Sequence, residues 1–248
     1  MFDQLAQWFQ GVKAEFILNF MEKDRWRLLV TGLGNTLLMS LLAVLIGVAL
    51  GMIIALFRST WDNLLPRQRR GIGGVVLRIC NRLSVLYVTV IRGTPVVIQL
   101  LIMYYIIFAS STNGLMVATL SFGLNSAAYV SEIIRGGIMS MERGQMEAGR
   151  SLGFNYLQTM WYIIAPQVLR QVLPPLANEF IVLLKETSVA GYVTVADLAF
   201  AGNRIRGITF SAFMPLVAVA LIYLVLVVLL TMLVGKLERR LRQSDQRS

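Results

Sequence analysis

Long uncharged blocks alternate with charged segments along the chain, and the uncharged blocks have the length of membrane-spanning helices. Residues 36–57 contain no charge, and as a helix they would extend about 33 Å, which matches the hydrocarbon core of a bilayer. Further apolar blocks at 84–109, 115–138, 167–189 and 212–234 predict four more spans. The pattern therefore predicts an all-α integral membrane protein with five transmembrane helices.

Small residues recur every four positions within the first span, at Ala43, Gly47, Gly51 and Ala55. A stripe of this kind lets the backbone of another helix approach closely. We therefore expect the first span to pack tightly inside the bundle.

The chain divides into three regions by its polarity. Residues 1–30 mix charged residues with apolar ones at helical spacing, which predicts an amphipathic interfacial segment. Residues 31–235 form the transmembrane domain, and residues 236–248 form a basic tail. No soluble domain is expected.

Lysine and arginine distinguish the two sides of the membrane. Loops 58–82, 135–170 and 236–248 contain fifteen of these residues, against six in the N-terminal segment and loops 109–114 and 189–211. Cytoplasmic loops carry the excess of positive charge in membrane proteins. The N-terminus is therefore predicted outside, and the C-terminus in the cytoplasm.

Composition excludes much enzyme chemistry. The chain has 248 residues, of which 56% are hydrophobic, one is cysteine and none is histidine. Intrachain disulfides, the common zinc sites and serine–histidine triads are excluded, so no catalytic residue and no metal site are expected. The net charge of +10 is explained by the cytoplasmic loops, so nucleic acid is not an expected partner. No GxxxxGK[ST] stretch occurs, so this chain is not expected to bind ATP.

The loop between the third and fourth spans has an unusual sequence, "EAGRSLGFNYLQTMWYIIAP" at residues 147–166. A polar helical turn comes first, Gly153 interrupts it, and Pro166 marks the start of the next span. Two short helices joined at a glycine are predicted. They could lie along the membrane surface and present a knob to a partner.

This loop resembles the signature loop of binding-protein-dependent ABC importer permeases, which reads Glu-Ala-Ala, three residues, Gly, nine residues, Ile, one residue, Leu-Pro. The residues in register are Glu147, Ala148, Gly153, Ile163 and Pro166. The chain departs from the pattern twice, with the small or apolar residues Gly149 and Ala165.

Three further stretches look like motifs of the polar amino acid branch (histidine, glutamine or arginine type) of this family. They are "VIRGTPVVIQLL" (90–101), "AAYVSEIIRGGI" (127–138) and "LPPLANEFIVLLKETSVAG" (173–191). The resemblance covers about residues 30–235.

The resemblance implies a type I ABC importer permease in the inner membrane of a bacterium. A dimer of separate ATPase subunits would bind ATP and Mg²⁺ and would receive the coupling loop, residues 142–166, in a surface groove. The residues that would couple to it are Glu147, Ala148, Gly149 and Gly153. The other implied partners are a second permease subunit, identical or similar, an extracytoplasmic amino acid binding protein and membrane lipids.

Glu179 is the main substrate-binding candidate. It lies about 18 Å along the fourth span from the inner face, just after two prolines that would loosen the helix. Asn178 and Glu179 could hold the ammonium group or cationic side chain of an amino acid, with Thr187 and Ser188 lining the outer exit. The alternative is a structural ion pair between Glu179 and Lys185, or an arginine of another span.

Arg92 and Glu132 are predicted to lie at the same depth in the second and third spans. They could form the strut of a gate or a structural salt bridge that keeps both charges buried. Arg135 competes for Glu132 at helical spacing.

Two other function classes are less consistent with these features. A secondary transporter driven by an ion gradient would also place acids at mid-membrane, but it would leave the signature loop unexplained and would usually need more spans or an inverted repeat. A membrane-embedded enzyme lacks a convincing nucleophile and base. The sequence therefore predicts a permease subunit that imports a polar amino acid, with Glu179 favouring a cationic one.

Overall fold

The computed structural model describes residues 2–63 and 71–245, which form helices joined by turns, with no strand among them. The all-α expectation is confirmed for this part of the chain. The helices are α1 (Phe2–Phe16), α2 (Trp26–Asn63), α3 (Ile72–Gly93), α4 (Val96–Ile102), α5 (Gly114–Met139), α6 (Arg143–Ser151), α7 (Tyr156–Thr159), α8 (Ala165–Glu186), α9 (Leu198–Thr209) and α10 (Phe213–Asp245). Short π or 3₁₀ turns connect them at η1 (Ile17–Met21), η2 (Glu22–Asp24), η4 (Met103–Ile107), η5 (Met160–Ile164) and η6 (Thr187–Val193).

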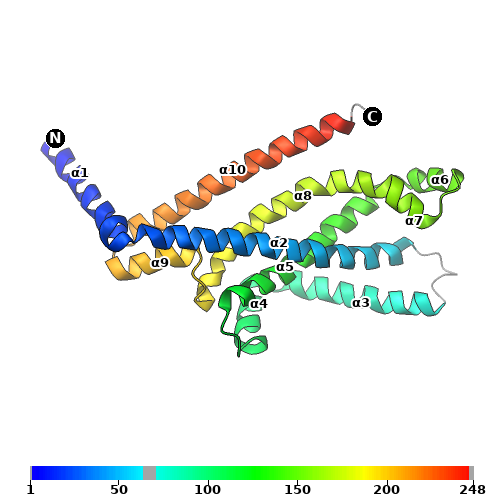
Figure 1. The fold of residues 1–248 in the computed structure, drawn as a ribbon, viewed down its shortest axis with the longest axis horizontal. Coiled ribbons are helices and arrows are strands. Elements are labelled where there is room, and N and C mark those ends of the chain that lie inside the picture. Colours follow the sequence, from blue (N-terminus) through cyan, green and yellow to red (C-terminus); the bar gives the residue numbers. More distant parts are fainter. Residues whose placement is uncertain (1, 64–70, 246–248) are drawn as a thin grey trace.

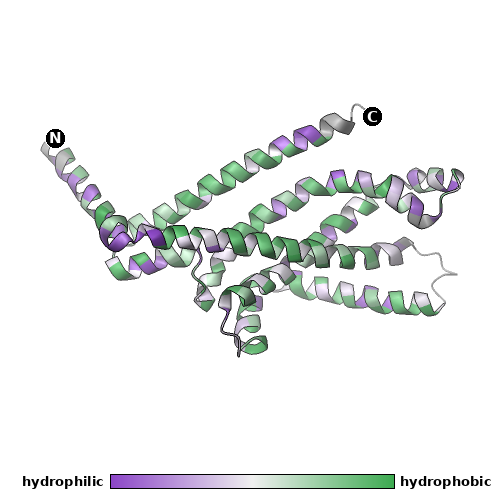
Figure 2. Cartoon of the chain, viewed as in Figure 1, coloured by the Kyte–Doolittle hydropathy of each residue, from purple (hydrophilic) through white to green (hydrophobic). Residues whose placement is uncertain are grey.

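The long helices run along the length of the molecule, with α1 and α9 at one end and α6 and α7 at the other (Figure 1). The C-terminal end of α10 lies towards the same end as α6 and α7. Helices α2 and α10 are hydrophobic over most of their length, and α10 becomes hydrophilic near its C-terminus (Figure 2).

Three of the described helices are long and apolar enough by themselves to cross a membrane, namely α2, α3 and α10. Helices α5 and α8 contain 26 and 22 residues, which is also sufficient length. Both contain polar residues and pack inside the bundle, so apolarity alone does not identify them. The chain is a multi-pass membrane protein.

The small-residue stripe of α2 packs directly on α5. A Cβ added at Gly47 would lie 2.7 Å from the Oγ of Ser126, and one at Gly51 would lie 2.8 Å from the Cβ of Val130. Such distances are too short for a side chain, so only glycine permits this approach. Both alanines of the stripe are fully buried. The expected close packing is confirmed.

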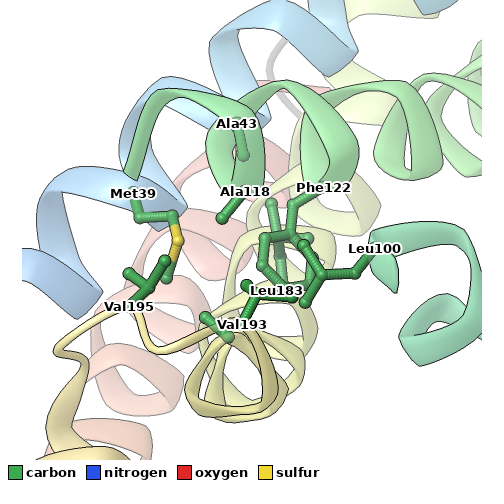
Figure 3. Close-up of a cluster of buried hydrophobic side chains, with 9 residues drawn as sticks. Met39, Ala43, Leu100, Ala118, Phe122, Leu183, Val193 and Val195 are labelled. Carbon is green, nitrogen blue, oxygen red and sulfur yellow. The ribbon is translucent and has the colours of Figure 1, made fainter. Parts of the chain in front are cut away.

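Buried side chains from five elements meet in one apolar core (Figure 3). Met39 of α2, Leu100 of α4, Phe122 of α5, Leu183 of α8 and Val193 of η6 are all buried there. This core fixes the short helix α4 and the turn η6 against the long helices.

The predicted second span, 84–109, is two helices. Helix α3 ends at Gly93, and Thr94 is extended with φ −120° and ψ 146°. Pro95 has no amide hydrogen to donate and disfavours a helical conformation in the residue before it, so α4 starts anew at Val96.

The predicted loop 58–82 is also shorter than expected. Its residues 58–63 belong to α2 and its residues 72–82 to α3, while 64–70 lie outside the described residues. Apolar residues recur at helical spacing from Ile72 to Leu83 and lie exposed on α3, where lipid can cover them. The arginines between these apolar residues made this helical segment look like a loop in the sequence.

The N-terminal segment contains two helices instead of one. After α1 the chain turns through η1 and η2, where Lys23 and Asp24 have positive φ, and α2 begins at Trp26. The buried amide of Asn19 fixes this turn, because it donates to the Ser211 hydroxyl at 3.2 Å and accepts from the Thr209 hydroxyl at 2.8 Å. At the other terminus α10 continues through the predicted tail to residue 245, and 246–248 lie outside the described residues.

Candidate functional site

The loop between α5 and α8 consists of two short helices that meet at Gly153. The φ of Gly153 is +84°, a conformation that favours glycine. Across the turn, the Phe154 amide donates to the Gly149 carbonyl at 3.1 Å, which is the pattern of a helix ended by a left-handed glycine. The predicted helix–glycine–helix arrangement is present.

One hydrogen-bonded pair caps α7, and one close contact packs α6 against it. The backbone amide of Gln158 donates to the side-chain Oδ1 of Asn155, and the backbone amide of Asn155 donates to the side-chain Oε1 of Gln158, both at 2.9 Å. This reciprocal pair caps the start of α7. Gly149 of α6 contacts the buried Thr159 of α7 so closely that an added Cβ would lie 2.7 Å from the Thr159 Oγ1. Glycine at position 149, the first departure from the signature pattern, therefore permits tight packing of α6 on α7.

The loop presents apolar side chains outward. Leu152, Trp161 and Tyr162 are 72%, 73% and 68% exposed. Glu147 and Ala148 are also exposed on α6. The base of the loop is anchored, because methionines of the loop pack on buried Ile164, Val168 and Val172. The loop is thus a fixed projection with an uncovered face.

Glu179 lies where α8 faces α5. The Ser126 hydroxyl donates to Oε1 of Glu179 at 3.0 Å, and the same Ser126 packs against Gly47 of α2. Glu179 is half-buried, whereas its neighbour Asn178 is exposed. The serine and the carboxylate thus come from different helices, and Gly47 provides the room for Ser126.

The structural alternative for Glu179 finds no support in the described part of the chain. No ion pair there joins Glu179 to a cation, and Lys185 is exposed on the same helix. Helix α8 also continues without interruption through Pro174 and Pro175, so the expected loosening does not break it.

Thr187 and Ser188 lie at the start of η6. The Thr187 side chain is completely buried, donates to the Leu184 carbonyl at 2.8 Å and lies 3.5 Å from the Ser40 hydroxyl of α2. Ser188 is half-buried. In this structure Thr187 faces the packed interior instead of lining an open exit.

Arg92 and Glu132 have different partners from those expected. Glu132 forms an ion pair with Arg58 of α2 and lies 3.8 Å from Arg135. The Arg92 guanidinium lies over the ring of Tyr129, 5.2 Å from its centroid. Arg135 also pairs with Asp62 at 3.0 Å, so the charges form a network between α2 and α5. The sequence did not suggest Arg58, because it follows the apolar block, where a loop is expected.

Gln99 was also missed. Its amide nitrogen donates to the Ile91 carbonyl at 2.7 Å and to the Thr94 Oγ1 at 2.8 Å, and its oxygen accepts from Asn125 of α5 at 2.9 Å. Gln99 therefore satisfies polar groups left free by the break at Pro95 and ties that break to α5. A glutamine four residues after a proline in an apolar block was the available signal.

Asp197 lies directly before α9, in the part of the sequence that joins α8 to α10. Its carboxylate accepts from the amides of Phe200 at 2.8 Å and Ala199 at 3.2 Å, so it is the N-cap of α9. Burial raises the pKa of Asp197 from 3.8 to about 6, although these amide hydrogen bonds oppose the shift.

Comparison with known proteins agrees with this arrangement. Residues 73–243 match the family described as "Binding-protein-dependent transport system inner membrane component". The chain is 33% identical over 220 residues to the glutamine transport system permease protein of Escherichia coli (strain K12), covering 87% of this chain and 93% of that protein. It is 31% identical over 220 residues to the arginine transport system permease protein of Bacillus subtilis (strain 168), covering 88% and 94%.

Solved structures show the same fold. A crystal structure of an amino acid ABC transporter with histidines matches with a TM-score of 0.77 and 35% identity, covering 89% of this chain and 98% of that chain. The MetNI methionine ABC transporter matches with a TM-score of 0.70 at 21% identity, covering 86% and 96%, which shows the fold alone. These relatives do not favour an ion-gradient-driven transporter. The chain belongs to the binding-protein-dependent inner membrane component family, the permease subunits of ABC importers.

Proposed function

We propose that this chain is the membrane-spanning subunit of an ATP-driven importer of a polar amino acid in the inner membrane of a bacterium. The observation that carries the proposal is the projection formed by α6, α7 and η5, with its exposed Leu152 and Trp161, in a chain of this family. A projection of this kind suits transmission of force from a separate subunit. Permease relatives named for glutamine, L-cystine and arginine support an amino acid as the substrate.

The proposed topology has five spans, α2, α3, α5, α8 and α10, with the N-terminus outside. The α6–α7 projection and the basic C-terminal part of α10 lie towards one end of the molecule, which supports placing that end in the cytoplasm (Figure 1). Helix α1, with Trp8 and Phe9 exposed, would then lie at the outer membrane interface.

The proposed mechanism needs other subunits. An ATPase dimer binds ATP and Mg²⁺ and receives Glu147, Ala148, Gly149 and Gly153 of the projection in its groove. A second permease subunit completes the pathway, and an extracytoplasmic binding protein delivers the amino acid. ATP binding drives the change only because its free energy differs between the inward- and outward-facing states.

Glu179 and Asn178 are proposed to bind the substrate. The Ser126 hydrogen bond orients the Glu179 carboxylate, and no cation pairs with it among the described residues. A negative group of this kind suits an α-ammonium group or a cationic side chain. Ser188 and Thr187 stay part of the proposed outer exit, and Thr187 would have to leave its buried position when that exit opens.

The test is ATP-driven uptake into proteoliposomes containing the chain, its co-purified ATPase and its binding protein. Arginine, glutamine, glutamate and cystine are compared for wild type, Glu179→Gln and the control Glu15→Gln on exposed α1. Wild-type uptake of one of them that stops without ATP is expected. Loss confined to cationic substrates would place Glu179 against the side chain, whereas uptake without the ATPase would overturn the proposal.

A further inference from the structure

The end of α2 and the start of α3 carry arginines at the depth of the membrane interface. The guanidinium of Arg78 on α3 lies over the ring of Trp61 on α2, 5.6 Å from its centroid. Trp61 follows the uncharged block 36–57 by four residues, and tryptophan is typical of the boundary between headgroups and hydrocarbon. Arg78 therefore lies at this boundary, and Arg82 lies one helical turn, about 6 Å, deeper along α3.

These two arginines have no acidic partner in the part of the chain that the structure describes. The acids of the neighbouring network, Asp62 and Glu132, each pair with an arginine across α2 and α5. Helix α3 itself contains no Asp or Glu. The stack on Trp61 uses only the face of the Arg78 guanidinium, so the N–H groups around its edge can still donate to an anion.

The spacing of the two arginines suits one phosphate group. Residues four apart lie on the same side of a helix, with Cβ atoms about 6 Å apart. Arg78 and Arg82 have this spacing, and both are exposed. Arginine binds phosphate oxygens through two parallel N–H groups, so both side chains can donate to the same phosphodiester.

An apolar row continues from the arginines along α3 into the hydrocarbon region. Ile79, Leu83 and Leu86 recur at helical spacing and are exposed, whereas the buried residues of α3 lie on another face of the helix. Helix α3 is long and apolar enough to cross a membrane, so acyl chains can contact this row. A phosphate site that continues into an acyl-chain contact fits a phospholipid better than a free phosphate ion.

We propose that this face of α3 binds one anionic phospholipid, with its phosphate on Arg78 and Arg82 and an acyl chain along Ile79, Leu83 and Leu86. A headgroup with a net negative charge is favoured, because choline or ethanolamine would bring a positive charge beside the arginines. Anionic lipids give the cytoplasmic leaflet its negative surface potential, and the proposed topology places this end of α3 in that leaflet. The site goes beyond the proposed transport function.

The test measures lipid contact at the site with a fluorescent probe. Leu86→Cys is combined with Cys80→Ser, which removes the one native cysteine, and is labelled with bimane in the complex with a cysteine-free ATPase. Phosphatidylcholine bilayers receive phosphatidylglycerol or phosphatidylcholine with brominated acyl chains, which quench the probe on contact. Each interfacial arginine should favour the anionic lipid about fivefold, so quenching should select phosphatidylglycerol roughly twentyfold. A probe at Leu221→Cys, exposed on α10, should show little selectivity.

Charge variants assign the selectivity to the two arginines. Arg78→Gln and Arg82→Gln should each lower it about fivefold, and the double variant should approach the value at the α10 probe. Trp61→Leu should lower it less than Arg78→Gln, because only the stack is removed. Arg239→Gln, which removes an exposed arginine of α10, should change nothing. Equal quenching by both lipids in the wild-type background, or full selectivity in the double variant, would overturn the proposal.

Two further results would identify a different occupant. Free glycerol phosphate, compared with chloride at the same ionic strength, should leave the selectivity intact, and its loss would indicate an anion site without a lipid. Absence of quenching by either lipid at Leu86 would show that protein covers this face, and the proposal would be wrong. Because quenching needs no ATP-driven uptake, its failure is distinguishable from failure of the proposed transport function.

Discussion

The Ser126 hydroxyl of α5 donates to the Glu179 carboxylate of α8 at 3.0 Å, and this bond orients the carboxylate that is proposed to bind the substrate. Ser126→Ala should raise KM about tenfold with a smaller change in kcat, because a hydrogen bond to a charged group contributes roughly 1.5–3 kcal/mol. Uptake kinetics in proteoliposomes measure this. Ser121→Ala is the matched control, since that buried α5 hydroxyl has no hydrogen-bond partner among the described residues. Equal effects of the two variants would contradict the role of Ser126.

Gly149→Ala should weaken coupling between ATP hydrolysis and uptake. The added methyl would overlap Thr159 and force α6 away from α7, at a cost of about 1–3 kcal/mol. We expect a lower ratio of amino acid imported to ATP hydrolysed. Gly144→Ala is the control, because a Cβ there meets nothing within 4 Å. Adding Thr159→Ala should restore part of the ratio, and no recovery would indicate that the two residues act independently.

Glu132→Gln should lower the free energy of unfolding of the solubilised protein by about 2 kcal/mol, because it removes the partner of the largely buried Arg58. Thermal denaturation measures the change. Arg58→Gln should have a similar effect, and the double variant should lose less than the sum of the two. Arg92→Gln combined with Glu132→Gln should be additive, since Arg92 contacts Tyr129 instead. If the combined effect of these two substitutions were clearly different from the sum of the single effects, the result would support the Arg92–Glu132 ion pair expected from the sequence.

Gln99→Leu should destabilise the protein by about 1–3 kcal/mol, because the polar groups of Ile91 and Thr94 and the amide of Asn125 lose a partner. Denaturation in detergent measures the change. Asn125→Ala leaves the bonds between Gln99 and the break intact, so its effect should be smaller. A Gln99→Leu protein as stable as wild type would show that water replaces these bonds.

Asp197→Asn should change how stability depends on pH. The folded state raises the pKa of Asp197 from 3.8 to about 6, so it binds the proton more tightly than the unfolded chain does. The contribution of the protonated carboxyl is therefore present at about pH 4 and is lost as the pH rises to about 6. The substituted amide stays neutral, so the melting temperature of the variant should rise relative to wild type across this window. Parallel curves from about pH 4 to 7 would contradict the shift. Asp197→Ala, which removes the cap, should be less stable at every pH.

Much of the fold followed from local sequence. The uncharged block at 36–57 and Gly153 between two short helices act through their own backbone. The small residues Gly47 and Gly51 mark a helix face that another helix can approach, although they do not say which helix packs there. Helical structure, close packing and the turn were therefore predictable. The break at Pro95 was visible in the sequence, but its consequence for the second span was missed because the apolar block continues past it.

Which side chains meet across the bundle could not be predicted in this way. Arg92 and Glu132 have similar predicted depths, but the rotation and crossing of the helices direct Glu132 towards Arg58 and Arg92 towards Tyr129. Thr187 is polar and near a helix end, yet packing against Ser40 buries it. The sequence by itself determined the class of protein and its helices, because hydropathy and helical spacing are local properties. Only the tertiary structure decided the partners, because a contact between helices depends on their relative rotation, which no single segment encodes.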